Sequence, residues 1–189
     1  MNLTLDHHIC GIRADGSEAV VAFFDLDQTL IDGYSLSALA WQQFFNGRIG
    51  LKRFWHLSRM FIRYARGRIN YEQMLQATVD SIAGMQEAEL VQLGRQAFAN
   101  KLSKKVYQEG RELVSTHLDC GHDVVMLTSA TRYQAEPIAQ ALDITHVVAT
   151  ELEIMDGRVT GMVAPCYGTG KLVAAESYLT SIGARLDRA

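Results

Sequence analysis

Two carboxylates follow a strongly apolar segment near the start of the sequence. The continuously apolar run at residues 20–24 predicts a buried strand of a parallel sheet, covered by helices on both faces. Asp25, Asp27 and Thr29 stand at its carboxyl end. Because ligands of open α/β sheets bind outside the carboxyl ends of the strands, we expect this strand to be central and the chemistry to occur at its tip.

The spacing of Asp25 and Asp27 restricts that chemistry. Two anions this close repel each other and resist desolvation, so a cation is expected beside them. Mg²⁺ suits the position, since it takes one or two carboxylates together with waters and a substrate phosphate. One carboxylate can then attack phosphorus to form an aspartyl-phosphate, while the other protonates the departing oxygen and later activates water. The alternative is a strand end whose aspartates merely cap a turn.

Residues 24–30, Phe-Asp-Leu-Asp-Gln-Thr-Leu, resemble the first motif of the haloacid dehalogenase superfamily of phosphotransferases. In that family the first aspartate is the nucleophile and the second is the acid and base, which implies these roles for Asp25 and Asp27. The resemblance further implies that both hold Mg²⁺, and that the backbone amide of Leu26 and the hydroxyl of Thr29 bind phosphoryl oxygens. The implied reaction is hydrolysis of a small phosphate ester.

Two later segments match the same family in the same order. Ser129, within residues 127–131, resembles the phosphoryl-binding hydroxyl of the second motif, although Ser129 or Thr131 is also expected to begin a helix. Lys171 resembles the third motif's lysine, which neutralises the nucleophile and the phosphoryl group. The glycines before Lys171 do not match a P-loop, because the required spacing is absent.

The sequence departs from the family at two places. Residues 149–161 resemble the branch that contains phosphoserine phosphatases, yet the Glu and Arg that hold serine there correspond to Tyr34 and Thr78 here. We therefore expect a phosphomonoesterase that is not specific for phosphoserine, with a phosphoserine phosphatase as the alternative. The acidic fourth motif has no match before Ala189, since Asp187 lies outside its pattern.

The missing fourth motif predicts a core truncated at its carboxyl end, weakened Mg²⁺ binding and an exposed sheet edge. It also leaves a competing class open. In that class the chain is a catalytically incomplete module with a binding or regulatory role in a longer protein, possibly one fused to an acyltransferase.

The remaining pattern indicates an α/β fold with a Rossmann-like, three-layer core at residues 18–31 and 103–189. Strands are expected at 20–24, 123–129 and 146–149, and a β-hairpin at 151–164 turns at Asp156-Gly157. Residues 32–102 read as helices throughout and form a cap inserted after the first strand, with Ser35 and Asn70 as helix caps. Residues 1–17 are expected to be a solvated leader.

The helix expected at residues 51–65 is basic and rich in aromatics. It suits a membrane surface or nucleic acid, or else a cap whose long basic side chains lie over an anionic substrate site. A net charge of −3 offers no general attraction for nucleic acid. No signal peptide and no apolar stretch long enough for a membrane span occurs, and the three cysteines lack disulfide or zinc spacing. These features predict a cytoplasmic protein, and they leave its oligomeric state open.

Overall fold

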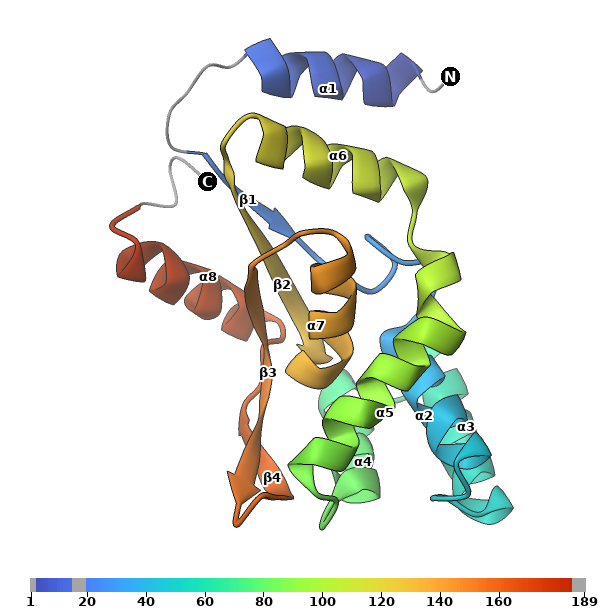
Figure 1. Ribbon diagram of the computed structural model, residues 1–189. Coiled ribbons are helices and arrows are strands. Elements are labelled where there is room, and N and C mark those ends of the chain that lie inside the picture. Colours follow the sequence, from blue (N-terminus) through green and yellow to red (C-terminus); the bar gives the residue numbers. More distant parts are fainter. Residues whose placement is uncertain (1–2, 15–19, 185–189) are drawn as a thin grey trace.

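The computed structural model describes residues 3–14 and 20–184, and its described part contains a four-stranded sheet (Figure 1). The strands are β1 (Val21–Phe24), β2 (Asp123–Thr131), β3 (His146–Met155) and β4 (Arg158–Ala164), in the order β1-β2-β3-β4. The first three are parallel, and β4 is antiparallel to β3. This arrangement confirms the predicted α/β fold with a mainly parallel sheet.

Helices cover both faces of the sheet and make three layers. On one face, α6 (Gln108–Asp119) and α7 (Arg132–Ala141) pack on the sheet through a core that includes Val114, Met126 and Ile138. On the other face, α8 (Thr169–Ser181) places Leu179 against Val21 and Val125. Burying apolar side chains between these layers is the main favourable contribution to folding.

The expectation that the first strand is central is wrong for the described residues, because β1 lies at one edge of the sheet. The apolar run is real, since Phe24 packs edge-on against His117 of α6 and Phe23 against Tyr178 of α8. A strand covered on both faces is apolar whether or not another strand pairs with its free side. Apolarity therefore predicted the layers correctly but could not predict the strand order.

Five α-helices lie between β1 and β2 in the described chain, and the first four are called here the inserted helices: α2 (Ser35–Phe45), α3 (Leu51–Ala65), α4 (Tyr71–Ile82) and α5 (Glu87–Asn100). A short 3₁₀ turn, η1 (Leu102–Lys105), leads from them to α6. The contact between α5 and α7 is close because Gly94 has no side chain, and a Cβ there would overlap the backbone carbonyl of Tyr133. Figure 1 shows the inserted helices beyond the carboxyl end of β2.

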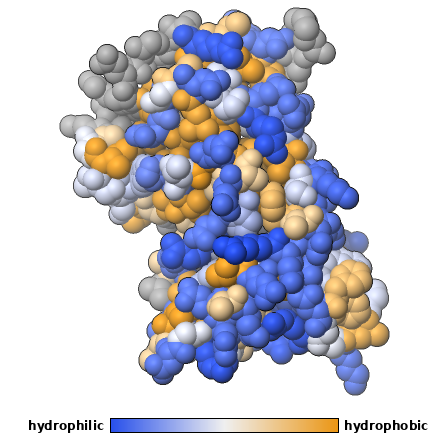
Figure 2. Space-filling view, in the orientation of Figure 1, coloured by the Kyte–Doolittle hydropathy of each residue, from blue (hydrophilic) through white to orange (hydrophobic). Residues whose placement is uncertain are grey.

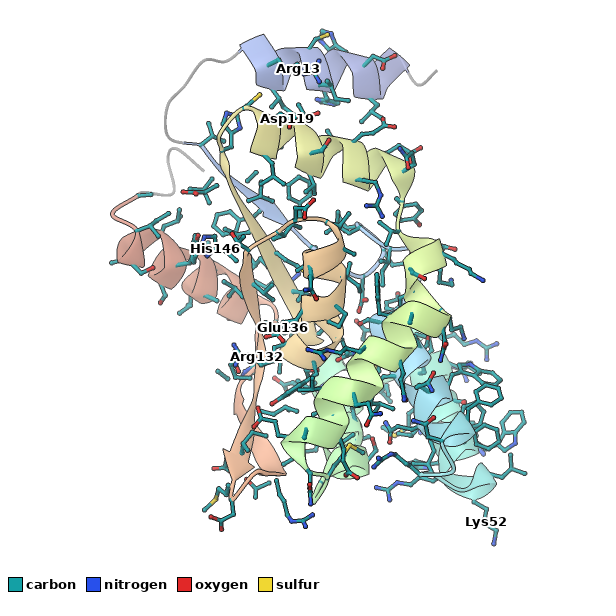
Figure 3. The ribbon with its side chains drawn as sticks, in the orientation of Figure 1. Arg13, Lys52, Asp119, Arg132, Glu136 and His146 are labelled. Atoms are coloured by element: carbon teal, nitrogen blue, oxygen red, sulfur yellow. The ribbon has the colours of Figure 1, made fainter. Side chains whose placement is uncertain are left out.

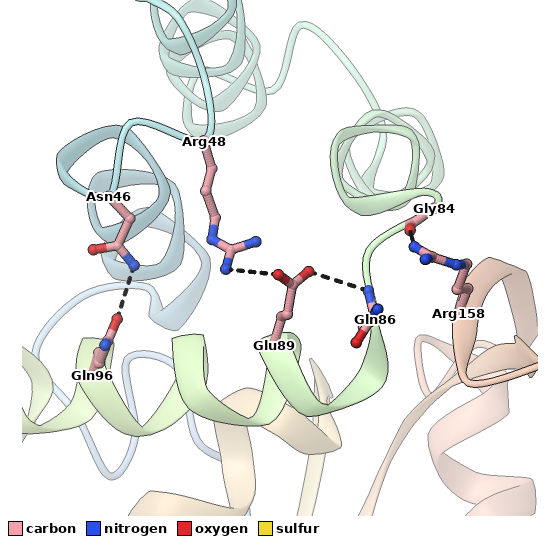
Figure 4. A network of polar contacts seen from close by, with 7 residues as sticks. All are labelled: Asn46, Arg48, Gly84, Gln86, Glu89, Gln96 and Arg158. Carbon is pink, nitrogen blue, oxygen red and sulfur yellow. Dashed lines mark hydrogen bonds and ion pairs between the residues drawn. The ribbon is translucent and has the colours of Figure 1, made fainter.

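Polar contacts attach the inserted helices to one another and to the hairpin (Figure 4). Arg48, in the loop after α2, forms an ion pair of 3.1 Å with Glu89 of α5. Asn46 donates to the Gln96 side chain at 2.8 Å, and Arg158 at the start of β4 donates to the carbonyl of Gly84 at 2.8 Å. These contacts hold the loops on either side of α3 and α4 against the more central α5 and β4.

Of the two helix N-caps predicted for the inserted helices, Asn70 and Ser35, one is found in the structure. Asn70 caps α4 as predicted, with its side chain accepting from the Gln73 amide at 2.9 Å. Ser35 does not cap α2, because it is the first helical residue and follows Tyr34 at the cap position. Its amide instead donates to the carboxylate of Asp27, which thereby takes the place of a capping side chain.

The hairpin forms as predicted, but it continues the third strand without a break. Residues 146–149 and the first arm of the hairpin make one strand, β3, that changes partner from β2 to β4. Asp156 and Gly157 connect β3 to β4 with φ angles of 49° and 72°. Positive φ at both central residues suits the twist of a two-residue hairpin, which explains why an Asp-Gly pair predicts it.

Most of the residues expected to form a solvated leader lie in a helix. Residues Leu3–Ala14 form a helix, α1, that lies alongside α6 (Figure 1), and the side chains of His7 and His8 are exposed. The remainder of the predicted leader, residues 1–2 and 15–17, lies outside the described residues. In the described part of the chain, no helix has both the length and the hydrophobicity to cross a bilayer.

The exposed side of α3 is basic and apolar at once. Leu51 and Trp55 of α3 and Phe45 of α2 are exposed. Figure 2 shows an apolar patch at the lower right of the molecule. Lys52 points away from the rest of the molecule in Figure 3. Arg63 and its arginine neighbours border a separate shallow hollow. Since none of the basic side chains of α3 lines the hollow described below, their position does not support an explanation by contact with an anionic substrate.

Candidate active site

Four of the predicted site residues meet in one hollow of about 350 Å³ beyond the carboxyl end of the sheet. Asp25 and Asp27 come from the loop after β1, Ser129 from the last part of β2, and Lys171 from the first turn of α8. They reach one place because parallel strands direct their carboxyl ends to the same edge. Side chains of the inserted helices form the opposite wall.

Asp25 is fixed by two donors. Its Oδ1 lies 2.8 Å from the Lys171 ammonium and accepts from the Leu26 amide at 2.8 Å. Glycines allow this approach of α8: Gly168 has a φ of +56°, and a Cβ on Gly170 would lie 2.7 Å from the Pro165 carbonyl oxygen. The glycines before Lys171 therefore shape the turn that delivers the lysine.

Asp27 lies deeper than Asp25 and has a different environment. Burial raises its pKa from 3.8 to about 6, and the charge of Asp25 also raises it, against the hydrogen bonds from Ser35 and the charge of Lys171, which lower it. The Ser35 amide donates to its Oδ1 at 2.8 Å, at the positive N-terminal end of α2. A carboxyl group with this pKa can both give and take a proton near neutral pH.

The raised pKa predicts how Asp27→Asn changes stability. Since the folded protein holds this proton more tightly than the unfolded chain, native Asp27 lowers stability as pH rises from 3.8 to about 6, and the loss remains above that pH. This rise in the pKa of Asp27 corresponds to about 3 kcal/mol of stability. Asparagine keeps an acceptor for Ser35 and carries no charge. Thermal unfolding should show Asp27→Asn more stable than wild type at pH 7.5, with a difference that disappears below about pH 4. A variant that is less stable at both pH values would contradict the assigned burial.

Ser129 is held by a buried hydroxyl that the sequence analysis missed. Thr150, which is fully buried, donates from Oγ1 to the Ser129 carbonyl at 2.8 Å and accepts from the Cys166 amide at 3.2 Å. It therefore joins β2 to the loop that leads to Lys171. A hydroxyl residue at a strand end was the only available signal, and it did not distinguish Thr150 from a turn residue.

A second buried connection joins β2 to Asp27. The Gln134 side chain accepts from the amide and hydroxyl of Thr131 at 3.0 and 2.9 Å, and it donates to the Ser35 hydroxyl at 3.1 Å. Ser35 in turn contacts Asp27. Gln134 therefore positions the deeper carboxylate, and Thr131, rather than Ser129, stands at the cap position of α7.

The side chains of two predicted site residues, Leu26 and Thr29, do not line the hollow. Thr29 is exposed and is absent from the lining of the hollow, because the chain turns sharply at Gln28, whose φ is 64°, and the next amides bond back to the Leu26 carbonyl. The Leu26 side chain is fully buried in the core, so only its backbone amide takes part, as a donor to Asp25.

The wall opposite the carboxylates is mainly apolar and aromatic. Tyr34 packs edge-on against Phe61 with ring centroids 5.0 Å apart, and Tyr64 and Tyr167 complete the aromatic lining. Thr78 also lines the hollow, but its hydroxyl donates to the Met74 carbonyl of its own helix at 2.9 Å. Apart from Asp25, Asp27 and Lys171, the lining contains no charged side chain in the part of the chain that the structure describes.

The metal donors that the site offers are few. Over residues 3–14 and 20–184, no cluster of three or more histidine, cysteine or acidic side chains is placed to hold a metal ion. Asp25 and Asp27 are hard oxygen donors at the edge of an open hollow. This set suits Mg²⁺, which commonly takes one or two carboxylates and completes its coordination with waters and substrate phosphate.

Comparison with known proteins agrees with the motifs. A probable phosphatase of Mycobacterium tuberculosis is 30% identical over 170 residues, covering 88% of this chain and 59% of the relative. A phosphoserine phosphatase of the same species is 30% identical over 173 residues, covering 88% and 56%. A protein of unknown function from Bordetella pertussis has a similar structure, with a TM-score of 0.78, 26% identity and coverage of 90% of this chain and 78% of that one.

These matches confirm the predicted family and its phosphoserine-phosphatase-like branch, while the chain spans 59% of the length of the first of these curated relatives. The family model for haloacid dehalogenase-like hydrolases matches residues 22–189, which include every segment that contributes to the hollow. The chain therefore belongs to the haloacid dehalogenase-like hydrolases.

Proposed function

We propose that the protein is a phosphatase that hydrolyses small phosphate monoesters through an aspartyl-phosphate on Asp25. The observation that carries this proposal is the contact of Asp25 with Lys171, beside a second, half-buried carboxyl group whose pKa is about 6. A carboxylate aligned by a cation is suited to attack phosphorus, and a neighbouring acid of that pKa is suited to protonate the leaving oxygen.

The proposed reaction has two steps. A carboxylate oxygen of Asp25 forms a bond to phosphorus as the ester bond breaks, and the Asp27 proton goes to the departing alkoxide. In the second step Asp27, now ionised, takes a proton from a water molecule whose oxygen attacks the same phosphorus, releasing inorganic phosphate and restoring the Asp25 carboxylate. Lys171, and Ser129 across the hollow, offset negative charge on the phosphoryl oxygens.

Mg²⁺ is the proposed cofactor, with Asp25 and Asp27 as the residues that hold it. When bound, the ion offsets charge on the phosphoryl group.

We also propose that residues 32–102 act as a cap on a core of residues 18–31 and 103–189, since side chains of α2, α3 and α4 line the hollow. A cap that closes excludes water during transfer. The cysteines at positions 10, 120 and 166 are free, which supports a reducing, cytoplasmic setting.

The test of this function compares two esters that differ only in their ionic groups. We expect hydrolysis of ethyl phosphate with a kcat/KM at least about tenfold above that of O-phosphoserine. The reason is that a hollow with Tyr34 and Thr78 in its wall leaves the ammonium and carboxylate of serine unpaired. Phosphate release is measured with Mg²⁺ and with EDTA, and EDTA is expected to suppress it. A preference for phosphoserine would instead support a phosphoserine phosphatase, and no turnover of either ester would contradict the proposal.

A further inference from the structure

A second cavity, of about 170 Å³, lies within the inserted helices. It is bounded by α2, α3 and α4, and its lining is mainly apolar, with Trp41, Phe54 and Leu57 among the contributors. An apolar cavity of about 150 Å³ in another protein stays dry and binds benzene, so a cavity of this size holds a ring or a short alkyl chain. The cavity is called here the helical cavity.

The helical cavity adjoins the catalytic hollow. Four side chains line both: Leu36, Phe61, Met74 and Thr78. These residues form a boundary one side chain thick, and three of them are apolar. The helical cavity therefore lies directly behind this part of the wall of the catalytic hollow.

One polar atom in the helical cavity has no partner. Gln43 is 2% exposed, and its Oε1 is buried without any hydrogen bond. Two hydroxyls of the lining are directed to backbone carbonyls, since Ser37 donates to the Tyr34 carbonyl and Ser81 to the Thr78 carbonyl. Buried polar atoms in folded proteins are almost always paired, so this acceptor calls for a donor from a ligand.

We propose that the helical cavity is the leaving-group subsite. The substrates are then monoesters whose alcohol carries an uncharged aromatic or alkyl portion, with a hydrogen-bond donor that reaches Gln43 Oε1. This inference rests on the proposed phosphatase function and names its substrate class. The mainly apolar lining of the helical cavity, the residues that it shares with the catalytic hollow and the orphan acceptor at Gln43 all support the same occupant.

Binding of uncharged probes tests the subsite separately from catalysis. Indole and benzofuran have nearly the same shape, but only indole has an N–H donor. Titration of the protein with each, followed by amide chemical shifts, should give at least tenfold tighter binding of indole. Gln43→Leu should bring the two affinities within about twofold of each other, whereas Gln92→Leu, on the exposed side of α5, should leave the preference unchanged.

Filling the cavity gives the second arm of the test. Ala77→Leu fills the cavity from α4, and Ala40→Leu fills it from α2. The test uses whichever of these variants folds, as judged by cooperative unfolding like that of the wild-type protein. Each should weaken indole binding at least tenfold, and each should lower kcat/KM for hexyl phosphate at least tenfold with methyl phosphate unchanged. Ala88→Leu, exposed on α5, is the matched control and should change neither.

The outcomes separate the subsite from the catalytic proposal. Indole binding that depends on Ala77 and Gln43, without turnover of any ester, would retain the subsite and reject the phosphatase function. Turnover of esters with no binding of indole, or with binding that is indifferent to both cavity-filling variants, would overturn the subsite. Equal affinity for indole and benzofuran in wild type would reject the role of Gln43.

Discussion

Asp25→Asn should lower kcat for p-nitrophenyl phosphate by on the order of 10⁴-fold or more, because the amide cannot attack phosphorus. Asparagine has the same shape as aspartate, and its Oδ1 can still accept from Lys171 and from the Leu26 amide. The loss should therefore come without unfolding. Initial rates with saturating Mg²⁺, together with a thermal unfolding curve, measure both effects.

The control for Asp25→Asn is a second carboxylate nearby in the chain. Asp32 is exposed and pairs with Lys105 at 3.5 Å, outside the lining of the hollow. Asp32→Asn should retain activity within about twofold, since a surface ion pair contributes little. Full activity in Asp25→Asn, with Asp32→Asn equally active, would remove Asp25 from the mechanism.

Asp27→Asn should separate the two steps of the reaction. Nitrophenolate is stable enough to leave without a proton, so phosphorylation of Asp25 continues, whereas attack by water then lacks its base. We expect a rapid burst of nitrophenol, up to one equivalent per protein, followed by turnover reduced by about 10²- to 10⁴-fold. Stopped-flow absorbance at high protein concentration records both phases.

An ester with a poor leaving group provides the comparison. Hexyl phosphate needs protonation of its leaving oxygen, so Asp27→Asn should give no burst of hexanol and an equally large loss of rate. If the variant instead showed no burst with either ester, phosphorylation of Asp25 would be the step that depends on Asp27 with both leaving groups. If Asp27→Asn hydrolysed hexyl phosphate as fast as the wild-type protein, Asp27 would be excluded as the acid.

The sequence was informative where a local pattern determines a local structure. Asp156-Gly157 predicted the hairpin because only certain residues accept the positive φ angles of a two-residue turn. Asn70 predicted a helix N-cap because its side chain can accept a hydrogen bond from an amide in the first turn, as it does from Gln73. The carboxylate pair and Ser129 predicted one site because successive parallel strands end at one edge.

Features that depend on distant parts of the chain could not be predicted in this way. The position of β1 at the sheet edge depends on which strands pair with it, and its apolar residues report only burial. Gln134 and Thr150 look like ordinary polar residues, and their roles appear only when Ser35, Ser129 and Cys166 are brought beside them. The position of Gln43 in a cavity requires three helices to be packed together.

The residues that line the hollow also change the interpretation of the basic helix α3. A basic helix over an anionic substrate was a reasonable explanation of residues 51–65, but Phe61 and Tyr64 are the α3 residues that line the hollow. Of the α3 arginines, Arg59 and Arg63 border a separate hollow, and Arg53 donates to the Asp80 carbonyl at 2.7 Å. Within the described part of the lining, Lys171 is the basic side chain that faces the carboxylates, which makes it the main local offset to their charge.

The central claim is that phosphate passes through a covalent bond to Asp25. The most direct measurement is to mix Asp27→Asn with p-nitrophenyl phosphate, quench the reaction in acid within the burst, and map the modification by peptide mass spectrometry. We predict one phosphoryl group, located on Asp25 in the peptide that contains residues 24–30. An unmodified peptide at the end of a full burst, or a phosphoryl group on any other residue, would contradict this account.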